Sequence, residues 1–212
     1  NYFEGNPLFN AGIGATCTAE GTFELDASIM EGKDLSAGAV AGLKHVKHPI
    51  NAAYAVKTKS PHVMLSGAGA EEFAKEQGLE MVEDNMYFAT PKTMEWIEKL
   101  KQESKKNGTV GCVVLDKQGN LTAGTSTGGM FKKRWGRIGD SPVIGAGTYA
   151  DNNSCAVSCT GHGEYFIRHA VAFNVCARYK YLKEPVGKAA DYIINTELNI
   201  NEGNGGLVAV DK

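Results

Sequence analysis

The stretch GTVGCVVLDKQGNLTAGTSTGG, from Gly108 to Gly129, predicts a β-hairpin. Its first arm, around Cys112 to Leu115, is apolar and rich in β-branched residues, and Leu121 to Thr127 forms the second arm. Between the arms, Lys117-Gln118-Gly119 has the composition of a three-residue hairpin loop with glycine at its third position. The fold of this region therefore depends on one turn.

The predicted loop also sets the register of the hairpin. If Asp116 pairs with Asn120, steps of one residue along the ladder pair Thr109 with Thr127. Paired residues point to the same face of a sheet, so we expect the two threonine side chains roughly 5 Å apart. A register shift of one residue would separate them.

The composition predicts one sizeable domain with a real core, because 212 residues at 42% hydrophobic content bury enough apolar surface. A net charge of -2 and no apolar run of membrane-spanning length give no reason to expect nucleic acid or a membrane as partner. The five cysteines lack the spacing of a disulfide framework, so we expect most of them to be buried thiols. Cys155 and Cys159 have no second pair of ligands, which argues against a zinc site.

Hydrophobic patterns and turn residues predict an α+β fold and argue against a doubly wound sheet, because strands and helices come in groups along the chain. Besides the hairpin, we predict strands over 13–18, 22–28, 37–43, 62–65, 143–149, 155–160 and 206–210, the first two as a hairpin. Helices are predicted over 49–57, 70–77, from Pro91 to about Leu100, 164–182 and 186–198. Residues 101–107, KQESKKN, carry no apolar side chain and predict an exposed, mobile tether that abuts the hairpin.

Cleavage of the peptide bond between Gly108 and Thr109 would create a residue suited to catalysis. A free Thr109 would have a hydroxyl and an α-amine with an ordinary pKa near 8, so the amine could act as base for the hydroxyl. Thr127 could then hydrogen-bond the nucleophile or its amine, although threonine is also simply a good strand residue. Uncut, the junction is an ordinary start of a strand.

Two further motifs could serve such a nucleophile. Thr160-Gly161-His162-Gly163-Glu164 lies between a predicted strand and helix, where unpaired backbone N–H groups could form an oxyanion site or merely a turn with an N-cap. We expect His162 to be a loop residue and not a base. In Gly136-Arg137-Ile138-Gly139-Asp140-Ser141-Pro142, Arg137 and Asp140 could pair with each other or could grip the carboxylate and ammonium of an amino acid.

Nucleotide-binding motifs are weak in this sequence. Gly67-Ala68-Gly69 precedes a predicted helix but lacks the third glycine and the acidic residue of a dinucleotide site, and no GK[ST] phosphate loop is present. We therefore expect no cofactor in catalysis.

The motifs GTVG, GTSTGG, GRIGDSP and TGHGE, together with NPLFNAGIG and SPHVMLSGAGA, resemble the plant-type L-asparaginase and isoaspartyl aminopeptidase family of N-terminal nucleophile hydrolases. The resemblance covers nearly the whole chain. It implies one hydrolase domain over 1–212 with a four-layer αββα sandwich, here lacking an N-terminal segment with a His-Gly-Gly-Ala-Gly strand and a C-terminal strand region. It also implies self-cleavage between Gly108 and Thr109, which divides the chain into an α part, 1–108, whose residues 101–108 form a flexible tail, and a β part, 109–212.

The resemblance assigns a role to each matching residue. Thr109 matches the nucleophile, Thr127 its supporting threonine, and Thr160 with Gly161 the oxyanion hole. Arg137 and Asp140 match the pair that grips the substrate's α-carboxylate and α-amine. The remaining matches are Gly163, a backbone acceptor for that amine; Asn10, an asparagine near the nucleophile grouped with the substrate-binding residues; and the backbone carbonyls of a structural sodium site, Phe3, Glu4, Asn6, Phe9, Ala11 and Ile13, which suit a hard cation.

The implied activity is hydrolysis of the side-chain amide of L-asparagine and of β-aspartyl dipeptides, through a threonine acyl-enzyme, in an assembly of two α/β heterodimers. Two alternatives stay open from the sequence. One is a glycosylasparaginase, which shares the chemistry but accepts a glycosylated amide. The other is a pseudoenzyme that binds aspartate or asparagine while Gly108-Thr109 stays intact. The sequence leaves the compartment open, with the cytoplasm slightly favoured.

Overall fold

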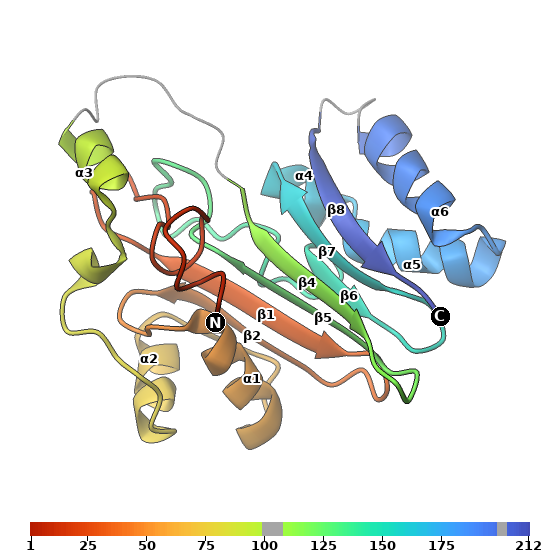
Figure 1. Cartoon of the computed structure of the whole chain (residues 1–212), viewed down its shortest axis with the longest axis horizontal. Helices are drawn as coiled ribbons and strands as arrows, with labels where there is room; N and C mark the ends of the chain where they lie inside the picture. The colour runs from red at the N-terminus through yellow and green to blue at the C-terminus, as the bar shows by residue number, and fades with distance from the viewer. Residues whose placement is uncertain (99–107, 199–202) are drawn as a thin grey trace.

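The fold is mixed α/β and is built on two β-sheets; the computed structural model describes residues 1–98, 108–198 and 203–212 (Figure 1). The larger sheet has the strand order β3-β2-β1-β5-β4 and the smaller one β6-β7-β8. All neighbouring strands run antiparallel except β3, which is parallel to β2. The strands are β1 (Leu25–Glu31), β2 (Ala37–Leu43), β3 (Met64–Ser66), β4 (Val110–Leu115), β5 (Leu121–Thr127), β6 (Thr148–Ala150), β7 (Ala156–Gly161) and β8 (Gly205–Val210).

The two sheets contact each other, with β4 and β5 against β7, and each sheet carries its own helices (Figure 1). On the larger sheet lie α1 (Pro49–Lys59) and α2 (Gly67–Glu76), and on the smaller one α4 (Gly163–Arg168), α5 (Val171–Leu182) and α6 (Val186–Tyr192). A 3-10 turn η1 (Asn85–Phe88), α3 (Pro91–Glu98) and a π-helical segment η2 (Ile193–Leu198) complete the elements. Among the described residues, no helix combines the length and apolar character that crossing a membrane requires.

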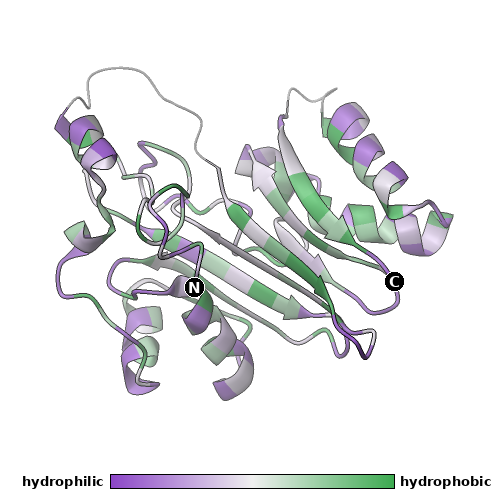
Figure 2. Cartoon of the chain, viewed as in Figure 1, coloured by the Kyte–Doolittle hydropathy of each residue, from purple (hydrophilic) through white to green (hydrophobic). Residues whose placement is uncertain are grey.

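The hydrophobic core consists of three clusters that lie between successive layers of the fold. One buried cluster lies between α1, α2 and the larger sheet around Phe23 and Val56, and a second lies between the smaller sheet and its helices around Phe166. A third cluster, which contains Met30 and Leu121, joins the two sheets and is made mostly of alanine. Figure 2 shows apolar green along the strands and more polar purple on α3 and α6.

The predicted hairpin and its register are confirmed. Leu115 faces Leu121 and Val110 faces Ser126 across β4 and β5. The Asp116 N–H donates to the Asn120 carbonyl at 2.9 Å, and Gly119 has a φ of 81° that favours glycine. The next pair beyond Val110 and Ser126 is therefore Thr109 and Thr127.

The hairpin predicted over 13–18 and 22–28 is wrong. Residues 13–18 belong to a loop, and the Thr18 N–H donates to the Thr22 carbonyl at 2.8 Å in a tight turn. Gly12 and Gly14 have positive φ angles, which curl the chain before the turn. β1 begins only at Leu25 and pairs with β2 and β5, so its two edges are already occupied.

Other predicted boundaries need smaller corrections. The helix predicted over 164–182 breaks into α4 and α5 at Ala170, which has a left-handed φ of 44°. The helix over 186–198 continues beyond α6 as the π-helical η2, and the strand over 143–149 is reduced to β6 because Gly145 has a φ of 92°. Thr90 caps α3 as predicted, since its Oγ1 accepts from the Thr93 N–H at 3.1 Å. Leu100 and the predicted tether 101–107 lie outside the described residues.

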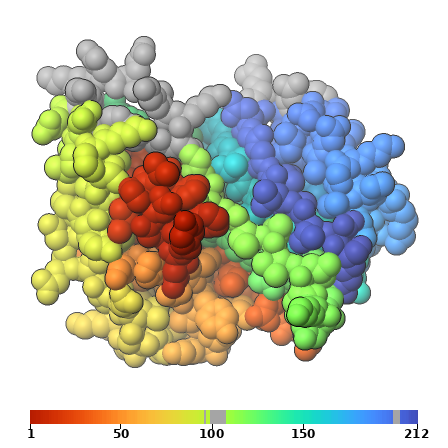
Figure 3. Space-filling view, viewed as in Figure 1, coloured from red at the N-terminus to blue at the C-terminus, as the bar shows by residue number. Residues whose placement is uncertain are grey.

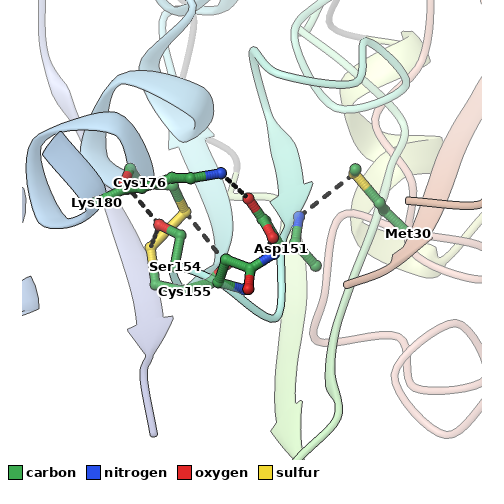
Figure 4. The surroundings of a disulfide bond; sticks show 8 residues. Met30, Asp151, Ser154, Cys155, Cys176 and Lys180 are labelled. Atoms are coloured by element: carbon green, nitrogen blue, oxygen red, sulfur yellow. Dashed lines mark hydrogen bonds and ion pairs between the residues drawn. A yellow bond between two sulfur atoms is a disulfide. The ribbon is translucent and has the colours of Figure 1, made fainter. Parts of the chain in front are cut away.

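The cysteines differ from the expectation of mostly buried thiols. Cys155, directly before β7, forms a disulfide with Cys176 of α5 and fastens that helix to the smaller sheet (Figure 4). Next to it, the Ser154 Oγ donates to the Cys176 carbonyl at 2.6 Å and Lys180 pairs with Asp151. Cys17 and Cys159 are buried free thiols, whereas Cys112 on β4 is exposed.

Candidate active site

Thr109 and Thr127 meet at the open end of the hairpin. The Thr109 Oγ1 donates to the Thr127 Oγ1 at 3.1 Å. The same Thr127 oxygen accepts the Gly129 N–H at 3.0 Å, so the turn that follows β5 holds it in place. The predicted juxtaposition of the two hydroxyls is confirmed, and Gly108, on the other side of the bond in question, is exposed.

The smaller sheet supplies the second half of the site. The backbone N–H of Thr109 donates to the Thr160 Oγ1 at 3.1 Å, which links the start of β4 to the end of β7. This nitrogen is the atom that cleavage after Gly108 would turn into an α-amine. Thr160 therefore lies against the amine position, a contact that its predicted oxyanion role did not include.

The backbone around Gly161 is more ordered than a loop with unpaired N–H groups. Gly161 ends β7 opposite Gly205, and the His162 N–H donates to the Asn204 carbonyl at 3.0 Å. Since successive N–H groups of an antiparallel strand point to opposite sides, the Gly161 N–H is directed away from β8. That side lies beyond the end of β6, so this donor remains suited to an oxyanion.

One cavity of about 740 Å³ contains most of these residues. It is lined by Thr109, Thr127, Gly129, Met130, Phe131, Arg137, Gly139, Asp140, Ser141, Thr160, Gly161, His162 and residues 204–206. A smaller, apolar cavity of about 220 Å³ lies beneath the N-terminal loop, against β4 and β5. Of these two cavities, the larger one combines hydroxyl, guanidinium and carboxyl groups, so it is the candidate active site.

Arg137 lines this cavity but does not pair with Asp140, which corrects one of the alternatives predicted from the sequence. Its Nε and Nη2 donate to the two carboxylate oxygens of Glu164 at 2.9 and 3.0 Å. A Cβ on Gly139 would lie 2.8 Å from the Arg137 Nη1, and one on Gly163 would lie 2.8 Å from its Nη2, so these glycines leave room for the guanidinium. Glu164 lies in the first turn of α4. The sequence did not indicate it as a partner of Arg137 because the two residues are 27 positions apart.

Asp140 is a buried carboxylic acid, and within the described part of the chain one of its oxygens is unpaired. The residue is only 5% exposed, and its Oδ2 has no hydrogen-bond partner among the described residues. Burial raises the pKa of Asp140 to about 6, and Arg137 partly opposes that rise. Gly163 packs closely against it, since a Cβ there would lie 2.9 Å from the Asp140 Oδ1. An ammonium group would satisfy the free oxygen and favour the ionised form.

A buried network of hydroxyls supports the loop that carries Asp140. Thr125 of β5 contacts the hydroxyls of Thr148 and Ser158, the latter at 2.7 Å. The Ser28 Oγ of β1 donates to the Ser141 carbonyl at 2.6 Å and lies 2.8 Å from the Thr148 Oγ1. Because Ser141 follows Asp140 directly, the network ties both sheets to this loop.

A buried ion pair also lies beneath Thr127. Asp26 of β1 faces Thr127 across the ladder and is fully buried, and its Oδ2 lies 3.8 Å from the Lys133 Nζ. Burial raises the pKa of Asp26, and Lys133 opposes that effect. No sequence motif indicated this pair, because its members lie in a strand and a distant loop.

Asn10 supports the site from behind and does not line the cavity. Its Nδ2 donates to the Gly129 carbonyl at 2.8 Å, and its Oδ1 accepts from the Thr16 N–H at 2.8 Å. Both ends of the amide are therefore engaged by backbone groups. This geometry favours positioning of the turn after Thr127 over direct contact with a substrate.

The N-terminal loop packs beside β4 (red in Figure 3). The backbone carbonyls of Phe3, Glu4 and Asn6 each accept a backbone N–H group from within the loop. The N–H that the Glu4 carbonyl accepts is that of Ile13. A Cβ on Gly14 would come within 2.6 Å of the Pro7 oxygen and 2.8 Å of the Phe9 oxygen. The Pro7 and Phe9 oxygens therefore lie close to one another, and backbone carbonyl oxygens are ligands that suit a hard cation.

Asn204, Gly205 and Gly206 are site residues that the sequence reasoning missed. They line the cavity from β8, and a Cβ on Gly205 would lie 2.4 Å from the Thr160 carbonyl. The glycines permit this close approach of β8 to β7. The glycine-rich run GNGG, residues 203–206, is the sequence feature that could have indicated them.

A hydroxyl pair beside a surface peptide bond, with a guanidinium and a buried carboxyl in the same cavity, is typical of hydrolases that use a hydroxyl nucleophile and bind an amino acid. The sequence model of a family described as "Asparaginase" matches residues 1–212. The chain is 48% identical to an isoaspartyl peptidase of Salmonella typhimurium, covering 98% of this chain and 71% of that protein. It is 45% identical to an isoaspartyl peptidase of Escherichia coli (97% and 68%) and 43% identical to a probable isoaspartyl peptidase/L-asparaginase 2 of Arabidopsis thaliana (98% and 72%). The chain therefore belongs to the asparaginase family.

Proposed function

We propose that this protein is a hydrolase that releases L-aspartate from L-asparagine and from β-aspartyl dipeptides. Family membership and relatives named isoaspartyl peptidase or L-asparaginase support this activity. The observation that carries the proposal on the chain itself is the Thr109 hydroxyl, 3.1 Å from the Thr127 hydroxyl in the cavity that also holds Arg137 and Asp140.

The chain first activates itself in this proposal. The Thr109 Oγ1 attacks the Gly108 carbonyl carbon, the peptide C–N bond breaks, and the nitrogen leaves as the free amine of Thr109. Water then hydrolyses the resulting ester. The products are an α part that ends at Gly108 and a β part that begins at Thr109.

The mature site then acts on the substrate. The Thr109 amine takes the proton of the Thr109 hydroxyl, whose oxygen attacks the side-chain carbonyl of the substrate. Thr160 and the Gly161 N–H stabilise the oxyanion, the C–N bond breaks, and ammonia or an amine leaves with a proton. Water releases aspartate from the threonine ester.

Arg137 and Asp140 set the substrate class. Arg137 binds the α-carboxylate, while Asp140 and the Gly163 carbonyl bind the α-ammonium. Holding both groups places the side-chain carbonyl at a fixed distance, which favours aspartyl over glutamyl substrates.

The remaining proposals concern the whole molecule. The two contacting sheets and their helices support the assignment to a four-layer αββα sandwich over a single domain. A sodium ion in the loop Phe3 to Ile13 would be structural, held by backbone carbonyls, with no part in bond cleavage. We further propose that the active form is an assembly of two α/β heterodimers.

The direct test is Thr109→Ala, with ammonia release from asparagine as readout. The variant lacks the nucleophile, so we expect an uncut chain and activity at the background level. Thr122→Ala, on the same hairpin but outside the cavity, is the control and should stay cut and active. Ammonia release by Thr109→Ala would contradict the mechanism. Parallel assays with a β-aspartyl dipeptide and a glycosylated asparagine separate this activity from that of a glycosylasparaginase.

A further inference from the structure

Glu164 holds Arg137 in a way that the proposed reaction does not explain. The pair is a side-on bidentate contact, with Nε 2.9 Å from Oε1 and Nη2 3.0 Å from Oε2. Bidentate geometry fixes the plane of a guanidinium, whereas a single contact leaves it free to rotate. Hydrogen bonds from Arg137 hold the pKa of Glu164 below its usual range, so the carboxylate stays charged.

The contact leaves one edge of Arg137 free for a second carboxylate. Guanidinium has five N–H donors in a rigid fork, and Glu164 occupies the edge formed by Nε and Nη2. The edge formed by Nη1 and Nη2 is the other one able to bind a carboxylate with two parallel hydrogen bonds. Arg137 lines the cavity, and the bare face of Gly139 lies against its Nη1.

Glu164 is itself restrained from its other side. The Nε2 of His162 lies 3.3 Å from the Glu164 Oε2, and the His162 ring packs edge-on against Tyr165 at 5.0 Å. Glu164 remains 47% exposed, so the contact contributes little to folding stability as a surface ion pair. Its geometry is better suited to orientation.

We infer that Glu164 is a positioning residue that orients Arg137, so that the free Nη1–Nη2 edge faces the α-carboxylate of the substrate. This inference rests on the proposed function and adds a residue to its specificity. It predicts that Glu164 affects substrate binding through Arg137 and leaves the cleavage of Gly108-Thr109 untouched, because that peptide bond presents no free α-carboxylate.

The test is Glu164→Gln, measured with a β-aspartyl dipeptide. Loss of one charge-assisted hydrogen bond should lower kcat/KM about tenfold, through KM, with kcat changed by less than about twofold. Glu164→Asp keeps the charge and should recover part of the loss. Glu184→Gln is the matched control, since Glu184 binds Arg178 in the same side-on manner away from the cavity, at 2.8 Å for both contacts. It should leave KM unchanged.

Two results would overturn the inference. The first is an unchanged KM in Glu164→Gln. The second is an equal loss when Glu164→Gln is added to Arg137→Ala, because residues that act through one another are not additive. Calorimetric binding of L-aspartate to the wild type and Glu164→Gln separates this test from the proposed function. Weaker binding by the variant supports the inference even if no hydrolysis occurs, and equal binding contradicts it.

Discussion

The end of the β4–β5 hairpin and the loop from Gly129 to Gly147 hold the two halves of the site by different means. The hairpin places Thr109 and Thr127 through a regular ladder, in which every pair from Leu115–Leu121 onward follows from one turn. The loop has no such ladder. It contains left-handed residues at Lys132 and Trp135, and its shape depends on contacts with both sheets.

The contrast separates reactivity from recognition. Regular hydrogen bonding holds Thr109, the proposed nucleophile, within a narrow range of positions, as a hydroxyl attack requires. The loop presents Arg137, which Glu164 contacts, and Asp140, whose pKa is raised by burial. Changes in the hairpin should therefore lower the rate of bond cleavage, whereas changes around the loop should weaken substrate binding.

After loss of the nucleophile itself in Thr109→Ala, the largest effect is expected from Thr127→Val. This change keeps the side-chain shape but removes the oxygen that contacts both the Thr109 hydroxyl and the Gly129 N–H. We expect kcat to fall about 10³-fold, with little change in KM, because the nucleophile loses its orientation. Steady-state ammonia release measures this, with Thr122→Val as control. A loss confined to KM would contradict the division between the two regions.

A second, smaller effect concerns Asp140. Its pKa of about 6 means that the carboxyl becomes neutral below that pH and loses its attraction for the substrate ammonium. Protonation of the Thr109 amine already lowers kcat/KM below about pH 8, and we expect a further loss of about tenfold per pH unit below the pKa of Asp140. Asp140→Asn should lower kcat/KM about 10²-fold at pH 7.5. A wild-type profile that stays flat down to pH 5 would contradict the assignment.

The free energy of unfolding serves as the control for Asp140→Asn. A carboxyl whose pKa is raised on folding binds more protons in the folded state, so its contribution to the free energy of unfolding falls as pH rises from about 4 to about 6. Asp140→Asn should therefore be at least as stable as the wild type at pH 7.5 in urea unfolding. A destabilised variant would mean that the activity loss reflects damage to the fold.

The smallest effect on catalysis is expected from Thr125→Val. The substitution removes the hydroxyl that joins Thr148 and Ser158 in the buried network. It should cost about 1–3 kcal/mol of unfolding free energy, and raise KM less than tenfold by loosening the Ser141 carbonyl. Urea unfolding and steady-state kinetics check this, and unchanged stability would show that the network does not brace the loop.

The two regions also differ in how much of them the sequence predicts. The hairpin could be predicted because a local turn sets its register, and the register alone brings Thr109 to Thr127. Contacts between segments far apart in the sequence left no local signal: Thr109 and Thr160 are 51 positions apart, and Arg137 and Glu164 are 27 apart. The wrong hairpin over 13–28 shows the limit, because its residues had strand-like composition while β2 and β5 occupied both edges of β1.

The central claim is that Thr109 is a latent N-terminus, and intact-mass measurement of the purified protein tests it most directly. We expect two fragments that meet between Gly108 and Thr109, with a free threonine amine at the start of the second. A single uncut species, retained after prolonged incubation at neutral pH, would contradict it and would favour a protein that only binds aspartate or asparagine.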